Sequence, residues 1–291
     1  MSAARTPEQT MALLARETRC RTGPVPRRFG TFVLDEDSRI FIDGQFALRT
    51  DSGYAFHYVP GDGISVERAA SADPVEADLW LAGSVYAAIA VLNGLYPFHA
   101  SAVEHRGAAH AFTGVSGAGK STLVAALGQR GYALLCDDTM LLDLSDPNRV
   151  IALPGHKRLK LTEQALALAG CDAIGQVGSD TGKHYAQPPG GIFPEPLPLA
   201  SLTWLEWGDA AALAPVHGSQ RLAALEDDHY TQHYYFEAVR PAREAIFALR
   251  SRLARQVAMS RLTRPQRPVW FANSVDLAEE AIRNFRQEIP I

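Results

Sequence analysis

The sequence has little cysteine. Cys20, Cys136 and Cys171 are an odd number of cysteines, and no two of them have the CxxC spacing of a zinc or redox motif. This argues against a disulfide framework and against a structural zinc site. We therefore expect a protein of a reducing, cytoplasmic environment.

An excess of charge of one sign is also missing. The 28 Lys and Arg residues nearly balance 32 Asp and Glu residues, which leaves a formal charge of -4. Such a balance indicates neither a nucleic-acid partner nor an anionic membrane, so any basic site must be local. Apolar residues make up 47% and charged residues 21% of the 291 positions, which excludes disorder of the whole chain.

Long apolar runs are nearly absent. Thr10 and Arg16 interrupt the N-terminal segment, so we expect no export signal. Residues 79–98 carry no charge and approach the length of a membrane span. However, Asn93-Gly94 is a helix stop and Pro97 forbids continuation, so the helix is limited to roughly four turns. We predict a buried core helix here and no membrane partner.

The remaining pattern predicts an α/β fold with two parts. Residues 1–72 contain a short helix and then alternating apolar and polar residues between turn clusters, which favours a small β-rich lobe. Residues 73–291 are expected to form the second, larger domain. Its first half is predicted to contain the core helix, a hairpin over 97–113, a helix over 121–130, strands over 132–136, 140–144 and 150–153, and a short helix over 162–169.

The second half of this domain begins with a long polar segment. Residues 171–190 are rich in Gly, Asp, Ser and Pro and predict a structureless loop, which we interpret as a candidate lid. The elements predicted after it are a strand over 199–207, helices over 219–238 and 241–262, a strand over 269–271 and a last helix capped by Asn273 or Ser274.

The most specific motif is GVSGAGKS over residues 114–121, which matches GxxxxGK[ST]. Glycines let the backbone wrap its N–H groups around a phosphate, and the helix that follows directs its positive end at the same anion. Lys120 is expected to be exposed and to bind the β- and γ-phosphates of ATP, and the Ser121 hydroxyl to bind Mg²⁺. The alternative is an ordinary glycine-rich turn, but an apolar strand precedes the motif and an amphipathic helix follows it. The predicted nucleotide-binding residues are Gly114, Ser116, Gly117, Ala118, Gly119, Lys120, Ser121 and Thr122.

Two adjacent carboxylates, Asp137 and Asp138, end the strand that follows this helix. The end of such a strand lies close to the phosphates, where one acid can bind Mg²⁺ and the other can accept the proton of an attacking hydroxyl. Neighbouring residues at a strand end point in different directions, so one acid for each role is expected. The alternative, a pair of acids that merely begins a turn, is disfavoured because residues 139–144 continue as a strand.

A histidine, the P-loop and the acid pair occur together in the order FHASAV, GVSGAGKST and ALLCDD. On its own, His99 is more typical of a structural residue than of a catalytic one. In this combination the sequence resembles the catalytic domain of the HPr kinase/phosphorylase family over about residues 97–153, and more loosely to residue 207. The resemblance implies a serine kinase that uses ATP and Mg²⁺, in which Asp137 is the base that accepts the proton, Asp138 is the metal ligand and His99 tunes the acid at Asp137.

The sequence also departs from that family. Thr122 stands where HPr kinases usually carry an acid, the N-terminal lobe is shorter, and a later phosphorylase signature is not found. The small β-rich lobe, the HAS sequence before the P-loop and the segment LPGHKRLKL resemble the HPr-kinase-like enzymes of lasso-peptide gene clusters. This resemblance implies phosphorylation of a C-terminal serine of a peptide precursor. The competing hypotheses are a nucleotide-gated switch or ATPase, and a kinase for a small-molecule hydroxyl. An oligomer is compatible with the sequence.

Three groups of cations have no assigned role. Arg158, in the run from His156 to Lys160, follows a strand end and could clamp phosphate or a peptide carboxylate, or could belong to a solvated turn. Lys183 lies in the lid candidate. The arginine-rich run from Arg243 to Arg267 could bind an acidic peptide, although such runs usually form a solvated face.

Overall fold

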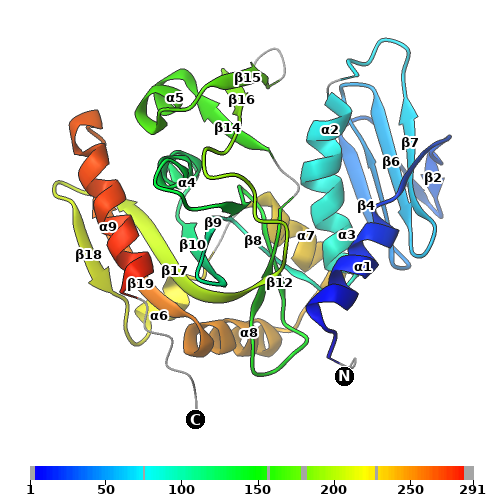
Figure 1. Ribbon diagram of the computed structural model, residues 1–291. Coiled ribbons are helices and arrows are strands. Elements are labelled where there is room, and N and C mark those ends of the chain that lie inside the picture. Colours follow the sequence, from blue (N-terminus) through cyan, green and yellow to red (C-terminus); the bar gives the residue numbers. More distant parts are fainter. Residues whose placement is uncertain (1–3, 75, 156–157, 178–181, 227–228, 285–291) are drawn as a thin grey trace. The chain divides into compact units, whose positions relative to one another are not determined.

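Each of the two structural units combines separate parts of the sequence. The computed structural model describes residues 4–74, 76–155, 158–177, 182–226 and 229–284 of a mixed α/β chain with several sheets (Figure 1). One unit consists of Met1–Pro97 with Asp228–Pro241, and the other of Phe98–Asp227 with Ala242–Ile291. The sequence placed its boundary at residue 72 instead, and the difference arises because the helices after it pack on the N-terminal sheet.

The N-terminal unit is built on an antiparallel meander. Thr6 caps α1 through a capping box with Gln9, and Pro7 occupies the first turn, which explains where this helix begins. The sheet order is β1-β7-β6-β5-β4, and β2 pairs with β3 separately. The elements are α1 (Pro7–Glu17), β1 (Cys20–Thr22), β2 (Arg28–Phe29), β3 (Phe32–Val33), β4 (Ser38–Ile42), β5 (Gln45–Arg49), β6 (Tyr54–Val59) and β7 (Gly63–Arg68).

Helices cover one face of this sheet. α2 (Glu76–Trp80), a π-helical turn η1 (Leu81–Val85) and α3 (Tyr86–Leu92) form one continuous helix, and α7 (Tyr230–Val239) packs against α3. Phe46 and Phe56 of the sheet, Ile89 of α3 and Tyr234 of α7 share one buried cluster. The helix ends at Leu92, as the sequence predicted. Along the parts of the chain that are described, no helix has the length and apolarity to cross a bilayer.

The second unit is organised around parallel strands. β10 pairs in parallel with β17, which pairs in parallel with β19, whereas β9 and β10 form the predicted antiparallel hairpin. The strand order is β11-β9-β10-β17-β13-β12, with β18 paired to β19, and the unit boundary falls inside β8. The strands are β8 (Tyr96–Phe98), β9 (Ala100–His105), β10 (Ala108–Thr113), β11 (Leu134–Cys136), β12 (Met140–Asp143), β13 (Ile151–Leu153), β17 (Leu197–Trp207), β18 (Ala212–Pro215) and β19 (Ala258–Arg264).

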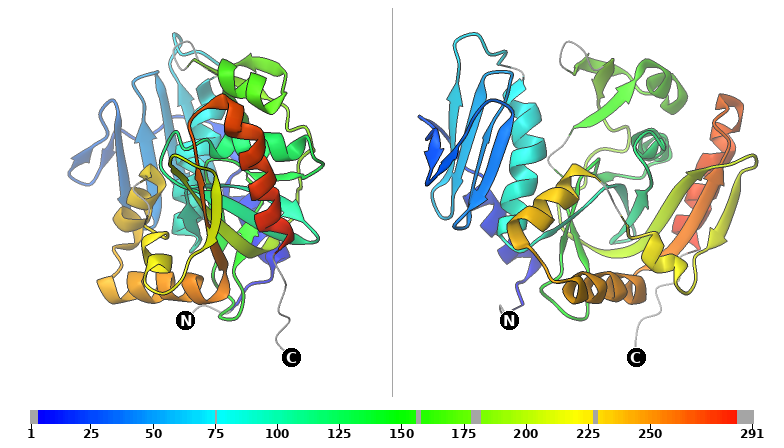
Figure 2. Two further views of the ribbon diagram at one scale, coloured as in Figure 1. Left: turned by 90° about the vertical axis from the view of Figure 1, so that its left-hand side faces the viewer. Right: turned by 180° about the vertical axis from the view of Figure 1, so that it is seen from behind.

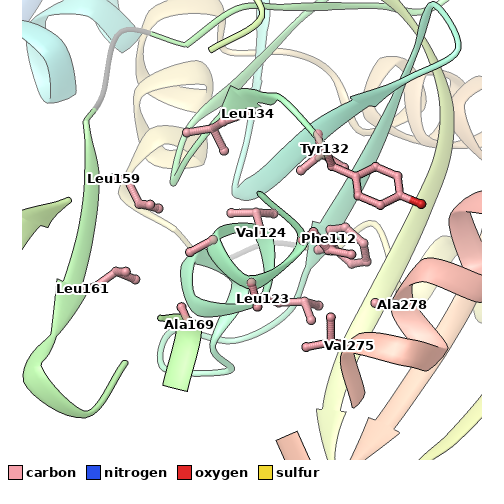
Figure 3. Packing of buried hydrophobic residues seen from close by; sticks show 14 of the residues in the cluster. Phe112, Leu123, Val124, Tyr132, Leu134, Leu159, Leu161, Ala169, Val275 and Ala278 are labelled. Carbon is pink, nitrogen blue, oxygen red and sulfur yellow. The ribbon is translucent and has the colours of Figure 1, made fainter. Parts of the chain in front are cut away.

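The helix after the glycine loop occupies the centre of this unit. α4 (Lys120–Gly128) is buried over most of its length and packs between β14 (Leu159–Thr162) on one side and α9 (Phe271–Arg283) on the other. Figure 3 shows Leu123 and Val124 of α4 between Leu161 and Val275. Figure 2 shows α9 running along β18 and β19. This packing fixes the position of the helix whose N-terminus carries the glycine loop. The other helices are α5 (Glu163–Ala169), α6 (Gln220–Ala223), α8 (Arg243–Gln256) and the short 3-10 turn η2 (Pro268–Trp270).

Four predictions of secondary structure are wrong. The helix predicted over 219–238 is instead two helices, α6 (Gln220–Ala223) and α7 (Tyr230–Val239). The segment 171–190 is not structureless, because β15 (Ala173–Gln176) pairs with β16 (Lys183–Ala186), and β16 in turn pairs with β14. The helix predicted over 241–262 ends at Gln256, and the chain continues as strand β19. The strand predicted over 269–271 is instead the 3-10 turn η2 and the start of α9, and α9 begins at Phe271, before the predicted cap.

Candidate functional site

The glycine loop joins β10 to α4, as its motif requires. Gly114, Gly117 and Gly119 have φ values of 144°, 80° and 80°, a region that residues with a Cβ rarely adopt. A Cβ at residue 114 would also come within 2.5 Å of the Leu205 carbonyl oxygen. Gly119 is the N-cap of α4, so the loop delivers the positive end of this helix to its own concave side. The backbone therefore has the form of an anion cradle.

The other predicted loop residues take different places. Ser116 is exposed, whereas Ala118 is buried, and its N–H donates to the Val115 carbonyl at 3.0 Å. The Ala118 carbonyl accepts a hydrogen bond from Arg264. Thr122 lies half-buried in the first turn of α4. A backbone and a side-chain hydrogen bond thus hold Ala118 on the buried side of the loop, whereas Ser116 faces solvent.

Lys120 is buried, contrary to the expectation that it is exposed. Only 6% of the residue is accessible, and its Nζ donates to the carbonyls of Gly114 at 2.9 Å and Val115 at 3.2 Å. The ammonium group therefore lies against its own loop. A charge held there by carbonyl dipoles is in position to meet an anion that enters the loop.

Ser121 and Asp137 lie in direct contact. The Ser121 hydroxyl donates to Asp137 Oδ1 at 2.8 Å, and the Ser101 hydroxyl of β9 donates to the same oxygen at 2.6 Å. Asp137 follows β11 and is only 2% accessible. A buried carboxylate needs polar or cationic partners, and carboxylate and hydroxyl oxygens are ligands that Mg²⁺ accepts. The oxygen set of Ser121 and Asp137 therefore fits a magnesium ion.

The neighbouring cysteine takes no part in this chemistry. Burial and, after it, the charge of Asp137 raise the pKa of the Cys136 thiol well above its ordinary value. Cys136 therefore stays a neutral, apolar side chain at the end of β11. Its thiol therefore adds no charge beside the acid pair.

Asp138 and His99 form a second contact at the same place. His99 Nε2 lies 3.7 Å from Asp138 Oδ1. Asp138 has a positive φ of 67°, and 38% of its side chain is exposed. The Thr113 hydroxyl donates to the His99 carbonyl at 3.0 Å and fixes the histidine to the end of β10. The structure thus brings the histidine, both acids and the P-loop serine together.

Two residues of this site escaped the sequence analysis. Ser101 stands two positions after His99, a spacing that places the two side chains on one face of a strand, so the signal was present. Arg264 had no such signal, because it lay in a segment interpreted as a solvated basic helix.

The predicted cations are dispersed. Arg158 is exposed and lies 5.2 Å from the centre of the Tyr185 ring, and Lys183 pairs with Thr162 across β14 and β16. Both therefore border the small sheet formed by β14, β16 and β15. His156 and Lys157, and residues 178–181 of the lid candidate, lie outside the described residues.

The arginine-rich run is not one continuous basic face. Arg252 donates to the carbonyls of Leu144, at 2.6 Å, and of Arg149, at 2.9 Å, and so holds the turn between β12 and β13. Arg250 lies 3.7 Å from Glu226, and Arg264 is buried. These three arginines stabilise the fold, which leaves less of the run to receive a peptide.

Comparisons with known proteins give little further information. No protein-family model matches the sequence, and no curated protein sequence matches it. A solved structure, the HPr(Ser) kinase/phosphatase from Coxiella burnetii, is similar over 65% of this chain and 97% of its own, with 12% identity and a TM-score of 0.32. A similarity of this size assigns neither a residue nor an activity.

Proposed function

We propose that the chain is an ATP- and Mg²⁺-dependent kinase that transfers the γ-phosphoryl group to a serine hydroxyl of a peptide or small protein. One observation carries the proposal. A P-loop serine is hydrogen-bonded to a buried aspartate, and a second aspartate in contact with a histidine follows directly in the chain. A site that only binds a nucleotide needs Ser121 and Asp137, whereas a site that transfers the phosphoryl group to a hydroxyl also needs a proton acceptor.

The contacts favour an exchange of the two acid roles that were assigned from the sequence. Asp137 Oδ1 already accepts hydrogen bonds from two hydroxyls, one of them the P-loop serine, which suits a metal ligand. Asp138 is more exposed and lies beside His99, which suits a group that meets an incoming hydroxyl. We therefore assign Asp137 and Ser121 to Mg²⁺, and Asp138 to proton acceptance with His99 as its positioning residue.

The loop supplies the remaining chemistry. Lys120 and the backbone at the start of α4 bind and orient the phosphate oxygens, and the ion, when bound, neutralises part of their charge. Asp138 accepts the proton of the serine hydroxyl as its oxygen bonds to the γ-phosphorus and the bond from that phosphorus to the bridging oxygen of ADP breaks. In this step, the proton that Asp138 accepts is the one that the residues of the site transfer.

A peptide acceptor is supported by the motif combination that resembles lasso-peptide kinases. On that ground we propose the C-terminal serine of a lasso-peptide precursor as the acceptor. The alternative is an acceptor hydroxyl on a small molecule, and the same experiment distinguishes it from a peptide serine.

The test compares peptides that end in serine with matched peptides that end in alanine, each incubated with the protein, ATP and Mg²⁺. Intact-mass spectra are expected to show one added phosphoryl group on the serine peptides alone, and none when Mg²⁺ is chelated. Release of phosphate to water at the same rate with either peptide would support an ATPase switch and refute the kinase.

A further inference from the structure

An open pocket of about 330 Å³ lies beside the P-loop, within the second unit. Gly117, Gly119 and Thr122 line it from the P-loop and the start of α4, and Trp207 of β17, Arg264 of β19 and Phe271 of α9 also line it. We infer that this pocket binds the base and ribose of the nucleotide, with Arg264 as the residue that joins the pocket to the loop. The inference rests on the nucleotide binding proposed above and extends it to the half of the ligand that carries no transferable phosphate.

The course of the phosphate chain leads to this pocket. Ser121 points to Asp137, which marks the metal side of the loop, whereas neither of these residues lines the pocket. Thr122, the next residue of α4, does line it. A nucleotide with its terminal phosphates at Lys120 and Ser121 can therefore extend its nucleoside past Thr122 into this open pocket.

Arg264 ties the two regions together. It is only 3% accessible, yet it ends strand β19 beneath the loop and donates from Nη2 to the Ala118 carbonyl. A Cβ at residue 119 would overlap Nη2, so Gly119 is needed for this approach as well as for its φ of 80°. Across the described chain, the buried Nε of Arg264 has no hydrogen-bond partner. The protein therefore leaves part of the hydrogen-bonding capacity of this guanidinium unused where Arg264 lines the pocket.

The guanidinium environment supports an anionic ligand. Burial lowers the pKa of Arg264 to about 10, which still leaves the side chain charged at neutral pH. Arg267 is a second cation of the wall, and neither Asp nor Glu occurs among the described residues that line the pocket. The cavity therefore offers positive charge to the α-phosphate and ribose end of a nucleotide.

The walls also offer planar surfaces to a base. The Arg264 guanidinium lies 4.8 Å from the centre of the Trp207 ring, and 39% of Trp207 remains exposed. Phe271 adds a second aromatic ring, and Gln164 and Gln266 add amide groups. Aromatic rings and guanidinium planes stack on bases, and the volume falls within the range of small-molecule sites.

The experiment measures binding rather than turnover, by calorimetry with Mg²⁺-ATP and with Mg²⁺-tripolyphosphate. Trp207→Ala is expected to weaken ATP binding about tenfold or more, as loss of one stacking partner does, and to leave tripolyphosphate binding unchanged. Trp270→Ala is the matched control, because Trp270 is 48% exposed and does not line the pocket. Thermal unfolding of both variants verifies that they are folded.

The outcomes separate this inference from the proposed kinase activity. Three results would overturn the pocket assignment and leave phosphoryl transfer intact. Trp207→Ala could weaken the binding of ATP and of tripolyphosphate equally, it could leave ATP binding unchanged, or Trp270→Ala could weaken ATP binding as much as Trp207→Ala does. Binding of ATP that depends on Trp207 without any phosphopeptide would support the pocket and refute the kinase. If the wild-type protein binds neither ligand, both proposals are wrong.

Discussion

Asp137→Asn and Asp138→Asn are expected to fail in different ways, although the two residues are adjacent. In Asp137→Asn, the amide oxygen can still accept from Ser101 and Ser121, but the negative charge facing the metal is gone. We expect Mg²⁺-dependent ATP affinity to fall by at least about tenfold, since even an indirect disturbance of a metal ligand costs that much.

Asp138→Asn leaves the metal ligands in place and removes the proton acceptor. Transfer should slow by about 10²-fold to 10⁴-fold, which corresponds to roughly 3 to 5.5 kcal/mol of transition-state stabilisation. Asn tolerates the positive φ of 67° at this position better than most residues do, so the backbone should be preserved. Because 38% of the side chain is exposed, we expect the free energy of unfolding to change by only about 0.5 kcal/mol.

The assay pairs calorimetric titration of ATP, with and without Mg²⁺, with phosphopeptide yield from intact-mass spectra. Asp143→Asn is the matched control, because Asp143 is a buried aspartate on β12 that accepts from the Ser145 N–H at 2.9 Å, outside the P-loop. It should lose neither function. The role assignment is wrong if Asp138→Asn weakens Mg²⁺-ATP binding while Asp137→Asn spares it.

Three further perturbations follow from the same contacts. Lys120→Ala should abolish detectable ATP binding in calorimetry because it removes the loop cation, with circular dichroism as the check that α4 persists; unchanged binding would remove the P-loop from the mechanism. Gly119→Ala should weaken ATP binding and also lower the midpoint of thermal unfolding, because alanine is strained at the positive φ of this position and its Cβ would overlap Arg264. An unaltered midpoint would contradict this reasoning. Burial, with the nearby His105, lowers the pKa of His110 from 6.5 to about 4. The unfolded chain therefore binds the proton first, and stability should fall by up to about 3 kcal/mol as the pH drops from about 6.5 to 4. Urea unfolding of His110→Gln should lack this slope.

The sequence predicted the parts of the site that depend on local chemistry. The glycine loop, the hairpin before it and the acid pair are short segments whose residue types leave few backbone alternatives. One acid of the pair could be expected to meet Ser121 because a strand follows the P-loop helix directly. Which acid does so could not be predicted, because it depends on the backbone conformation at the strand end, where Asp138 has a positive φ that the sequence does not signal.

The misassigned elements lack the usual signals. Only Val257 separates α8 from β19, and neither Gly nor Pro marks the change, so the arginine-rich segment reads as one helix. The strands β15 and β16 are only four residues each, and they are defined by pairing, β15 with β16 and β16 with β14, rather than by a strong intrinsic preference. Arg264 was missed for the same reason, since its place beneath the loop depends on β19 being a strand.

The division of the chain has a consequence for synthesis on the ribosome. Residues 1–97 leave the exit tunnel early, yet α7, at residues 230–239, supplies Tyr234 to the same buried cluster as Phe41 and Phe46. Until that helix emerges, the part of the aromatic cluster that Tyr234 covers stays exposed while more than a hundred residues of the second unit are being translated. A fragment cut at residue 97 should therefore be prone to aggregation, and the first unit becomes complete only after the P-loop segment has already been made.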